Sequence, residues 1–282
     1  MAVEAYFGAK TVWVSEIDKY ASKVIDARIN KPNIGDLKIV NWAEIEPVDI
    51  ITAGYPCQPF SHAGLRKGVL DERHLWPYIK QAVSTIRPSI VILENVRGHF
   101  KLGFREVLTD LTSIGYDVRW SIVRASDVGA PHRRERLFIV AEPTNTDSTG
   151  LQRCSGMRYG LEQSCSTTTD TDRYEQPRNG GVSRLGSRFN TRAQMRLQRA
   201  PDPLDINYKL NAKFVEYMMG LPAGWVTDLD ISRSQQLKIL GNGVVPQQAY
   251  RALELLCNIN SYPQGLKTCG QHAQAPLKLS TI

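Results

Sequence analysis

Short apolar runs alternate with amphipathic segments over residues 1–141 of the chain. Strands that alternate with helices in this way are typical of βαβ units, in which a helix connects two parallel strands. The sequence therefore predicts an α/β fold with a doubly wound, mostly parallel sheet. The expected strands are 11–15, 50–53, 89–93, 118–123 and 137–141, and the expected helices are 19–29, 75–86 and 104–114.

The composition changes after Pro143. Residues 143–208 are rich in Ser, Thr, Asp, Gly and Arg and lack apolar periodicity, so they cannot build a large core. All of their basic residues are arginines, including Arg153 and Arg158, and arginine suits bidentate contacts with phosphate or guanine. The segment is either a disordered polar insertion or a binding surface.

Helical patterns return at 214–219, closed by Gly220, and at 249–256, after an expected turn at Gly241-Asn242-Gly243. The tail that follows is polar and is expected to be frayed. The expected parts are a core at 1–142, a variable region at 143–208, a return to the core at 209–257 and a disordered tail at 258–282.

Net charge and cysteine usage narrow the functional class. The formal charge of +7 and the pI of about 9.2 favour a polyanionic partner such as nucleic acid. The five cysteines form no C-x-x-C pair, which argues against a zinc ribbon and against a disulfide framework. No apolar run approaches the roughly 18 residues of a membrane span. We therefore expect a soluble, cytoplasmic monomer without a metal, a membrane partner or an obligate protein partner.

One cysteine stands in an unusual context, in the octet from Gly54 to Ser61 (GYPCQPFS). Pro56 and Pro59 fix the backbone on both sides of Cys57 and exclude helix there. The thiol is thus expected at the carboxyl end of a strand, where open α/β sheets bind ligands. A lone cysteine is more often a buried apolar residue, but this context favours a nucleophile.

Four segments in this order give the chain a resemblance to a family. They are the octet around Cys57, Glu94-Asn95-Val96, Arg134-Glu135-Arg136 and the stretch from Gly241 to Pro246 (GNGVVP). Together they closely resemble the DNA cytosine-5 methyltransferases, over residues 11–141 and 210–256. The resemblance implies a Rossmann-like fold, and residues 143–208 match the target-recognition region by position only. It also implies a bacterial or phage-encoded enzyme that methylates double-stranded DNA with S-adenosylmethionine, as in restriction-modification.

The chemistry of the reaction explains the residue types. Carbon 5 of cytosine is a poor nucleophile, so a thiolate such as Cys57 must first add to carbon 6. Glu94 is implied to protonate ring nitrogen 3 and to recognise the flipped base. Arg134 and Arg136 are implied to organise the two groups, and their alternation on an extended segment would point both to one face. His132 stands where the family usually has glutamine.

The resemblance also implies binding residues. The implied cofactor residues are Glu16 at the ribose hydroxyls, Ile17 on adenine, Asp36 and Leu37 near the adenine amine, and Pro56, Leu75, Asn242 and Val244 around the pocket. The expected DNA-binding residues are Arg66 and Lys67 in a hinged loop, the phosphate-facing Arg133, and Arg153 and Arg158 in the variable region.

The sequence lacks the first strand and the Phe-x-Gly-x-Gly turn with which a family member begins, since residues 1–7 already resemble the helix that follows that turn. We therefore expect an exposed neighbouring strand edge and weak or absent methyl transfer from this chain, as a fragment or as a shortened protein. Two other functions remain open. One is methylation of RNA, and the other is a catalytically silent nucleic-acid-binding protein.

Overall fold

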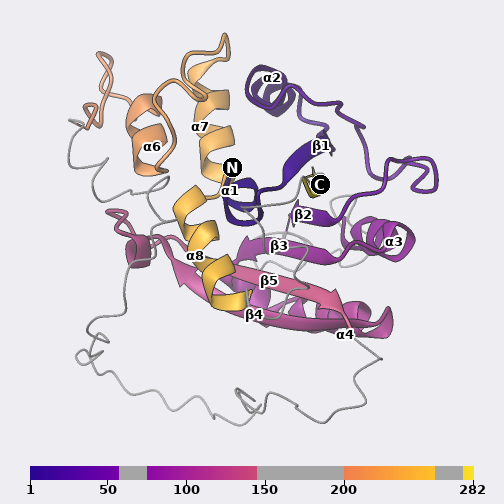
Figure 1. Cartoon of the computed structure of the whole chain (residues 1–282). Coiled ribbons are helices and arrows are strands. Elements are labelled where there is room, and N and C mark those ends of the chain that lie inside the picture. The colour runs from indigo at the N-terminus through magenta and orange to yellow at the C-terminus, as the bar shows by residue number, and fades with distance from the viewer. Residues whose placement is uncertain (57–74, 145–199, 258–275) are drawn as a thin grey trace, which may run out of the picture.

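The computed structural model describes residues 1–56, 75–144, 200–257 and 276–282 (Figure 1). The helices of these parts are α1 Ala2–Phe7, α2 Lys19–Arg28, α3 Trp76–Ile86, α4 Phe104–Ser113, α6 Ala212–Met218, α7 Arg233–Asn242 and α8 Pro246–Leu256, with 3-10 helices η3 Arg97–Lys101 and η4 Ala125–Val128. The strands are β1 Lys10–Val14, β2 Ile50–Gly54, β3 Ile90–Val96, β4 Tyr116–Arg124, β5 Glu135–Pro143 and β6 Lys278–Thr281. The strands and helices expected before residue 144 are all present, with ends that differ by a few residues.

The described strands form one six-stranded sheet in the order β1-β6-β2-β3-β5-β4. Neighbouring strands pair in parallel from β1 to β3, and β5 pairs antiparallel with both β3 and β4. Among the described strands only β5 therefore runs against the others. The prediction of a mostly parallel sheet is confirmed.

Helices cover both faces of this sheet, as Figure 1 shows for α8 on one side and α4 on the other. Alternate residues of β3 point to opposite faces because strand side chains have a period of two. Val91 and Leu93 pack in a core with α3 and α4, whereas Ile90 and Ile92 pack in a second core with α8 and residues next to α1. The expected doubly wound arrangement is confirmed.

Strand β6 corrects two expectations about the chain. It lies between β1 and β2 and is parallel to both, with Leu279 and Ser280 almost completely buried. The backbone N–H of Ser15 donates to the Thr281 carbonyl at 2.9 Å, and the N–H of Ile282 donates to the Thr52 carbonyl at 2.7 Å. The end of the expected disordered tail is thus an inner strand of the sheet. The expected free edge between β1 and β2 is absent, because β6 supplies the missing hydrogen bonds.

The last two helices return to the sheet and correct a further expectation. Gly241 and Asn242 are the last residues of α7 rather than a turn. The Arg134 guanidinium donates to the carbonyl oxygens of Gly241 at 2.8 Å and Gly243 at 2.5 Å, which stabilises this helix end. Helix α8 begins with Pro246, whose fixed φ suits the first position of a helix. Among the described residues, no helix combines the length and the apolar content that a membrane crossing needs.

Candidate active site

The carboxyl ends of the parallel strands meet at one edge of the sheet, which we call the active rim. Glu16 follows β1, and Gly54 at the end of β2 pairs in register with Glu94 on β3. Pro56 is exposed and is the last described residue before Cys57, which itself lies outside the described residues. The strand that leads to Cys57 therefore ends beside Glu94.

The segment before Cys57 is anchored by polar contacts that the sequence did not reveal. The Asn95 side chain donates to the Tyr55 carbonyl at 3.0 Å, and the Tyr55 hydroxyl shares a hydrogen bond of 3.0 Å with His99 Nε2. Burial lowers the pKa of His99 to about 4, so the ring is neutral at neutral pH. These contacts fix the backbone two residues before Cys57. A histidine on a 3-10 helix carries no sequence signal for this role.

Glu94 has the surroundings of a proton donor. Its side chain is 16% exposed, and Arg136 Nε lies 2.8 Å from its Oε1 atom. Burial raises the pKa of the Glu94 carboxyl, while the positive charges of Arg136 and Arg134 oppose that rise without cancelling it. A carboxyl group with a raised pKa holds its proton more readily and can deliver it to a bound ring nitrogen.

Arg134 differs from the geometry that the sequence predicted. Its φ of 23° lies in the left-handed region, and β5 begins one residue later, so Arg134 and Arg136 do not lie on one extended segment. Both guanidinium groups nevertheless act electrostatically on Glu94. Burial and the charge of Arg136 lower the pKa of Arg134 to about 10. Arg134 thus connects the end of α7 with the active rim.

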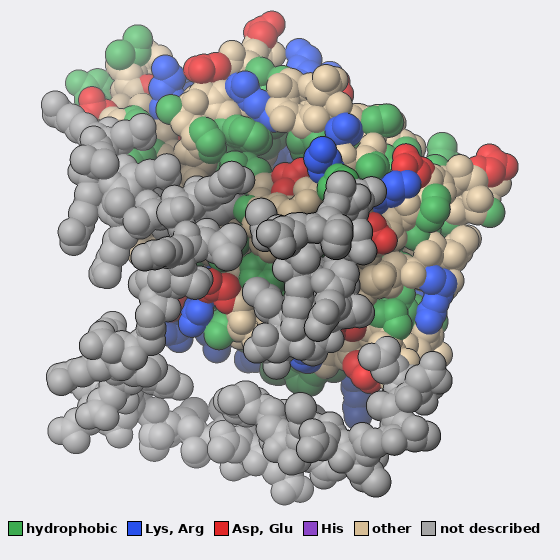
Figure 2. Space-filling model, in the orientation of Figure 1, with side chains coloured by type: hydrophobic (Ala, Val, Ile, Leu, Met, Phe, Trp, Pro, Cys, Tyr) green, Lys and Arg blue, Asp and Glu red, His purple; other side chains and the backbone are tan. Residues whose placement is uncertain are grey.

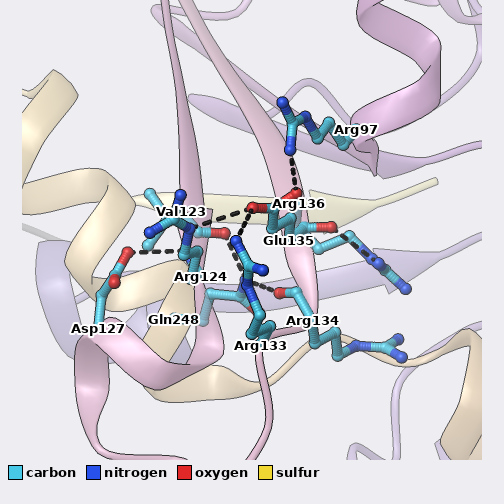
Figure 3. Close-up of polar contacts among 9 residues, drawn as sticks. All are labelled: Arg97, Val123, Arg124, Asp127, Arg133, Arg134, Glu135, Arg136 and Gln248. Atoms are coloured by element: carbon cyan, nitrogen blue, oxygen red, sulfur yellow. Dashed lines mark hydrogen bonds and ion pairs between the residues drawn. The ribbon is translucent and has the colours of Figure 1, made fainter. Parts of the chain in front are cut away.

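Gln248 on α8 holds this irregular segment in place. Its side-chain nitrogen donates to the carbonyl oxygens of Val123 and Arg134, both at 2.7 Å, as Figure 3 shows. His132 Nε2 donates to the Met218 carbonyl at 2.8 Å and so points toward α6. A glutamine on an amphipathic helix gives no sequence signal for such a role, and Gln248 was missed.

A second glutamate near the active rim gathers three arginines (Figure 3). Glu135 Oε2 accepts from Arg97 at 2.6 Å, and its Oε1 lies 3.1 Å from Arg124 Nε and 3.6 Å from Arg133 Nη2. The hydrogen bond from Arg97 is the largest cause that lowers the pKa of Glu135, so the carboxylate is ionised at neutral pH. Of the three arginines, only Arg133 was singled out from the sequence.

The residues implied at the cofactor lie along β1, β2 and the adjoining loops. The Glu16 carboxylate accepts from the backbone N–H of Asp18 at 2.8 Å, and the neighbouring Ile17 side chain is 71% exposed. Ser15 Oγ donates to the Gly35 carbonyl at 2.6 Å, which brings the loop with Asp36 close to β1. An exposed apolar side chain beside a carboxylate fits an adenine ring and its ribose.

The other implied cofactor residues have different surroundings. Leu37 is buried in the core, and Leu75 is half-buried against the same core at the start of α3. Asn242 is exposed at the end of α7, and Val244 is half-buried against the core under α8. Leu37 is therefore part of the core rather than a surface that a ligand could contact.

Several expected residues lie outside the described residues. They are Cys57, Arg66, Lys67, Arg153 and Arg158. In the described part of the chain, no group of His, Cys, Asp and Glu side chains could hold a metal ion. On the face seen in Figure 2, the visible lysine and arginine side chains are interspersed with acidic ones.

Comparison with solved structures supports the fold. The chain superimposes on Dnmt2 methyltransferase from S. pombe with a TM-score of 0.58 and 18% identity, covering 91% of this chain and 95% of that one. A putative DNA modification methyltransferase encoded within an E. coli prophage gives a TM-score of 0.56 at 18% identity, covering 90% and 93% of the two chains. Likeness at this level of identity establishes a shared fold.

Sequence comparison identifies the family. Type II methyltransferase M.NlaX of Neisseria lactamica is 38% identical over 143 residues, which is 49% of this chain and 46% of that protein. M.BsuFI of Bacillus subtilis is 37% identical over 136 residues, or 46% and 33% of the two chains, so the match spans less than half of either relative. The family described as C-5 cytosine-specific DNA methylase matches over residues 3–216. The chain belongs to the C-5 cytosine-specific DNA methylase family.

Proposed function

We propose that this chain is a DNA cytosine-5 methyltransferase in which Cys57 adds to carbon 6 of a flipped cytosine. The observation that carries the proposal is the Glu94 carboxyl, buried beside Arg136 and adjacent in the sheet to the end of β2, three residues before Cys57. A thiol and a protonated carboxyl near one point are what addition to a cytosine ring requires.

The proposed reaction assigns a balanced change to each residue. The Cys57 thiolate forms a bond to carbon 6 while Glu94 gives a proton to ring nitrogen 3, so the electron pair of the 5,6 double bond becomes available at carbon 5. S-adenosylmethionine, when bound, supplies the methyl group that carbon 5 takes up. A water molecule then takes the carbon 5 proton, the electrons of that C–H bond re-form the double bond, Cys57 leaves as a thiolate, and Glu94 recovers its proton from nitrogen 3. Arg136 and Arg134 hold Glu94 in place throughout.

The cofactor residues are part of the proposal. We assign Glu16 to the ribose hydroxyls and the exposed Ile17 to the adenine ring, with Asp36 near the adenine amine. Calorimetric titration of the chain with S-adenosylmethionine measures this binding directly. Because Ile17 is 71% exposed beside Glu16, Ile17→Asp is expected to abolish the binding heat.

A covalent trap tests the proposed function. Duplex DNA carrying 5-fluorocytosine, with millimolar S-adenosylmethionine, is expected to give a protein–DNA adduct that survives denaturation, because fluorine at carbon 5 cannot leave as a proton does. Cys57→Ala should give no adduct. Cys257→Ala is the matched control, because Cys257 is buried in the core under α8. An adduct that persists in Cys57→Ala, or none from the unmodified chain, would overturn the proposal.

Substrate class and site of action need separate experiments. An excess of unmodified duplex DNA is expected to suppress the adduct, and an equal excess of transfer RNA is not. The reverse order would favour an RNA substrate. Bisulfite sequencing of DNA from an expressing host would then report the methylated sequence. We expect the enzyme to act on DNA in the cytoplasm as a monomer.

A further inference from the structure

We propose that Arg97, Arg124 and Arg133, gathered around Glu135, form a binding site for phosphate groups of the nucleic-acid backbone beside the active rim. We call these four residues the arginine cluster. The inference rests on the proposed function, because it assumes a nucleic acid that crosses the active rim. It adds Arg97 and Arg124, which no sequence motif marks, to the surface that receives the substrate.

The arginine cluster is built from three segments of the chain that meet at the amino end of β5. Arg97 begins η3 directly after β3, Arg124 ends β4, and Arg133 lies in the loop before β5. Arg124 and Glu135 are opposite each other in the antiparallel register of β4 and β5. The strands thus carry two of the four residues, and Figure 3 shows the other arginines directed at the same carboxylate.

The charges of the cluster do not balance. Three guanidinium groups share one carboxylate, which is ionised because hydrogen bonding to Arg97 lowers the pKa of Glu135. Asp127 is the nearby acid, but its contact is with the backbone N–H of Arg124. Even when Asp127 is counted, the cluster keeps a net positive charge.

The excess charge faces solvent. The side chains of Arg97, Arg124 and Arg133 are 62%, 49% and 75% exposed. Elsewhere on the same hairpin, Arg119 of β4 pairs with Glu142 of β5. Exposed guanidinium groups in excess over their anions are suited to phosphate oxygens, which they can bind in bidentate fashion. Phosphate contacts of this kind position a nucleic acid without reading its sequence.

The position of the cluster fits a strand that approaches Glu94. Glu135 and Arg136 are consecutive on β5, so their side chains point to opposite faces of the sheet. Arg136 reaches Glu94 on one face, and Glu135 holds the arginines on the other. A backbone that passes over the active rim would therefore meet the cluster while one of its bases reaches Glu94.

Salt dependence of DNA binding tests this inference. Fluorescence anisotropy with a labelled duplex, at a series of salt concentrations, gives the slope of log affinity against log salt. Each neutralised phosphate contributes about 0.9 to that slope in B-DNA. We expect the double variant Arg97→Gln/Arg124→Gln to lower the magnitude of the slope by about 1.8. Arg119→Gln, the matched control on β4, should leave it unchanged.

A charge-retaining variant separates binding from folding. Arg97→Lys/Arg124→Lys keeps both positive charges and should restore the slope, which a general loss of structure could not do. A slope that is the same in the glutamine double variant and in the unmodified chain would overturn the inference alone. A chain that forms no adduct and does not bind duplex DNA at low salt would overturn the proposed function, and this inference with it.

Discussion

Glu94 and Glu135 lie near each other at the active rim, and both have arginine partners, yet their pKa values shift in opposite directions. Each glutamate side chain is 16% exposed. The difference lies in what covers them. Glu94 is covered by the protein interior and by Arg136, which is itself only 15% exposed, whereas Glu135 is covered by arginine side chains that are 49% exposed or more.

The comparison shows that the number of arginine partners does not decide the state of a carboxyl group. Solvated partners leave Glu135 in a polar environment, so hydrogen bonds and charge stabilise its ionised form. Around Glu94 the loss of hydration outweighs the attraction of its arginines. One edge of the sheet therefore holds two different glutamates. Glu94 is suited to proton transfer, and Glu135 is suited to organising cations.

The largest expected effect comes from removing the proton donor. Glu94→Gln should lower the single-turnover rate of adduct formation by about 10²–10⁴-fold at saturating DNA, because an amide cannot give a proton to the ring. Glu142→Gln, at the far end of β5, is the control and should keep the rate. Rapid quench of the fluorocytosine reaction measures both. A Glu94→Gln rate equal to that of the control would remove Glu94 from the chemistry.

Replacing one arginine partner of each glutamate tests the comparison by the change in the free energy of unfolding. Arg136→Gln should destabilise the fold by about 3 kcal/mol, because it leaves a buried carboxyl without its partner. Arg97→Gln breaks an exposed pair and should cost less than about 1 kcal/mol. Urea unfolding followed by circular dichroism measures both free energies. Equal losses would mean that the two glutamates share one kind of environment.

The pH dependence of stability should have opposite signs at the two glutamates. Glu135 has a lowered pKa, so its contribution is present above the ordinary value of 4.5 and is lost as the pH falls below it. Glu94 has a raised pKa, so the folded state holds its proton more tightly, and stability declines as the pH rises above 4.5 through the folded-state value. A plot of the urea unfolding midpoint against pH should become flatter below pH 4.5 in Glu135→Gln and above pH 4.5 in Glu94→Gln. Changes in the same pH range would contradict the assignment.

The smallest expected effect on stability is at Arg133. Its guanidinium is 75% exposed and lies 3.6 Å from Glu135, so Arg133→Gln should change the free energy of unfolding by less than about 0.5 kcal/mol. The same variant should lower the salt slope of DNA binding by about 0.9. Thermal denaturation and anisotropy titration of one preparation would report both. A large loss of stability would mean that Arg133 stabilises the fold rather than serving as a surface residue that binds DNA.

The sequence predicted the elements whose pattern is local. Strands β2, β3 and β5 are apolar runs, and the carboxyl ends of the parallel strands β2 and β3 place Glu94 beside the segment that leads to Cys57. Strand β6 was missed because four residues, three of them polar or charged, carry little periodicity. Its identity as a strand depends on β1 and β2, which come from the other end of the sequence.

Site residues were predicted where a local motif indicates their chemistry. They were missed where residues from separate segments meet only in the folded chain. Glu94 and Arg136 belong to recognisable motifs, and the structure joins them in an ion pair. The arginine cluster brings Arg97 and Arg124 together across separate segments, and no local pattern encodes that meeting. The turn of the backbone at Arg134 was also missed, because it depends on tertiary contacts with Gln248 and the end of α7.

The place of β6 sets the order in which the sheet can assemble. Thr52 and Ser280 are 228 positions apart and hydrogen-bond to each other, whereas β3, β4 and β5 pair over much shorter stretches of chain. Pairings across long sequence separations form slowly, so β3, β5 and β4 are expected to associate first. Until β6 docks, β1 and β2 expose unpaired backbone groups that can join other chains. Light scattering during dilution from denaturant should therefore rise steeply with protein concentration.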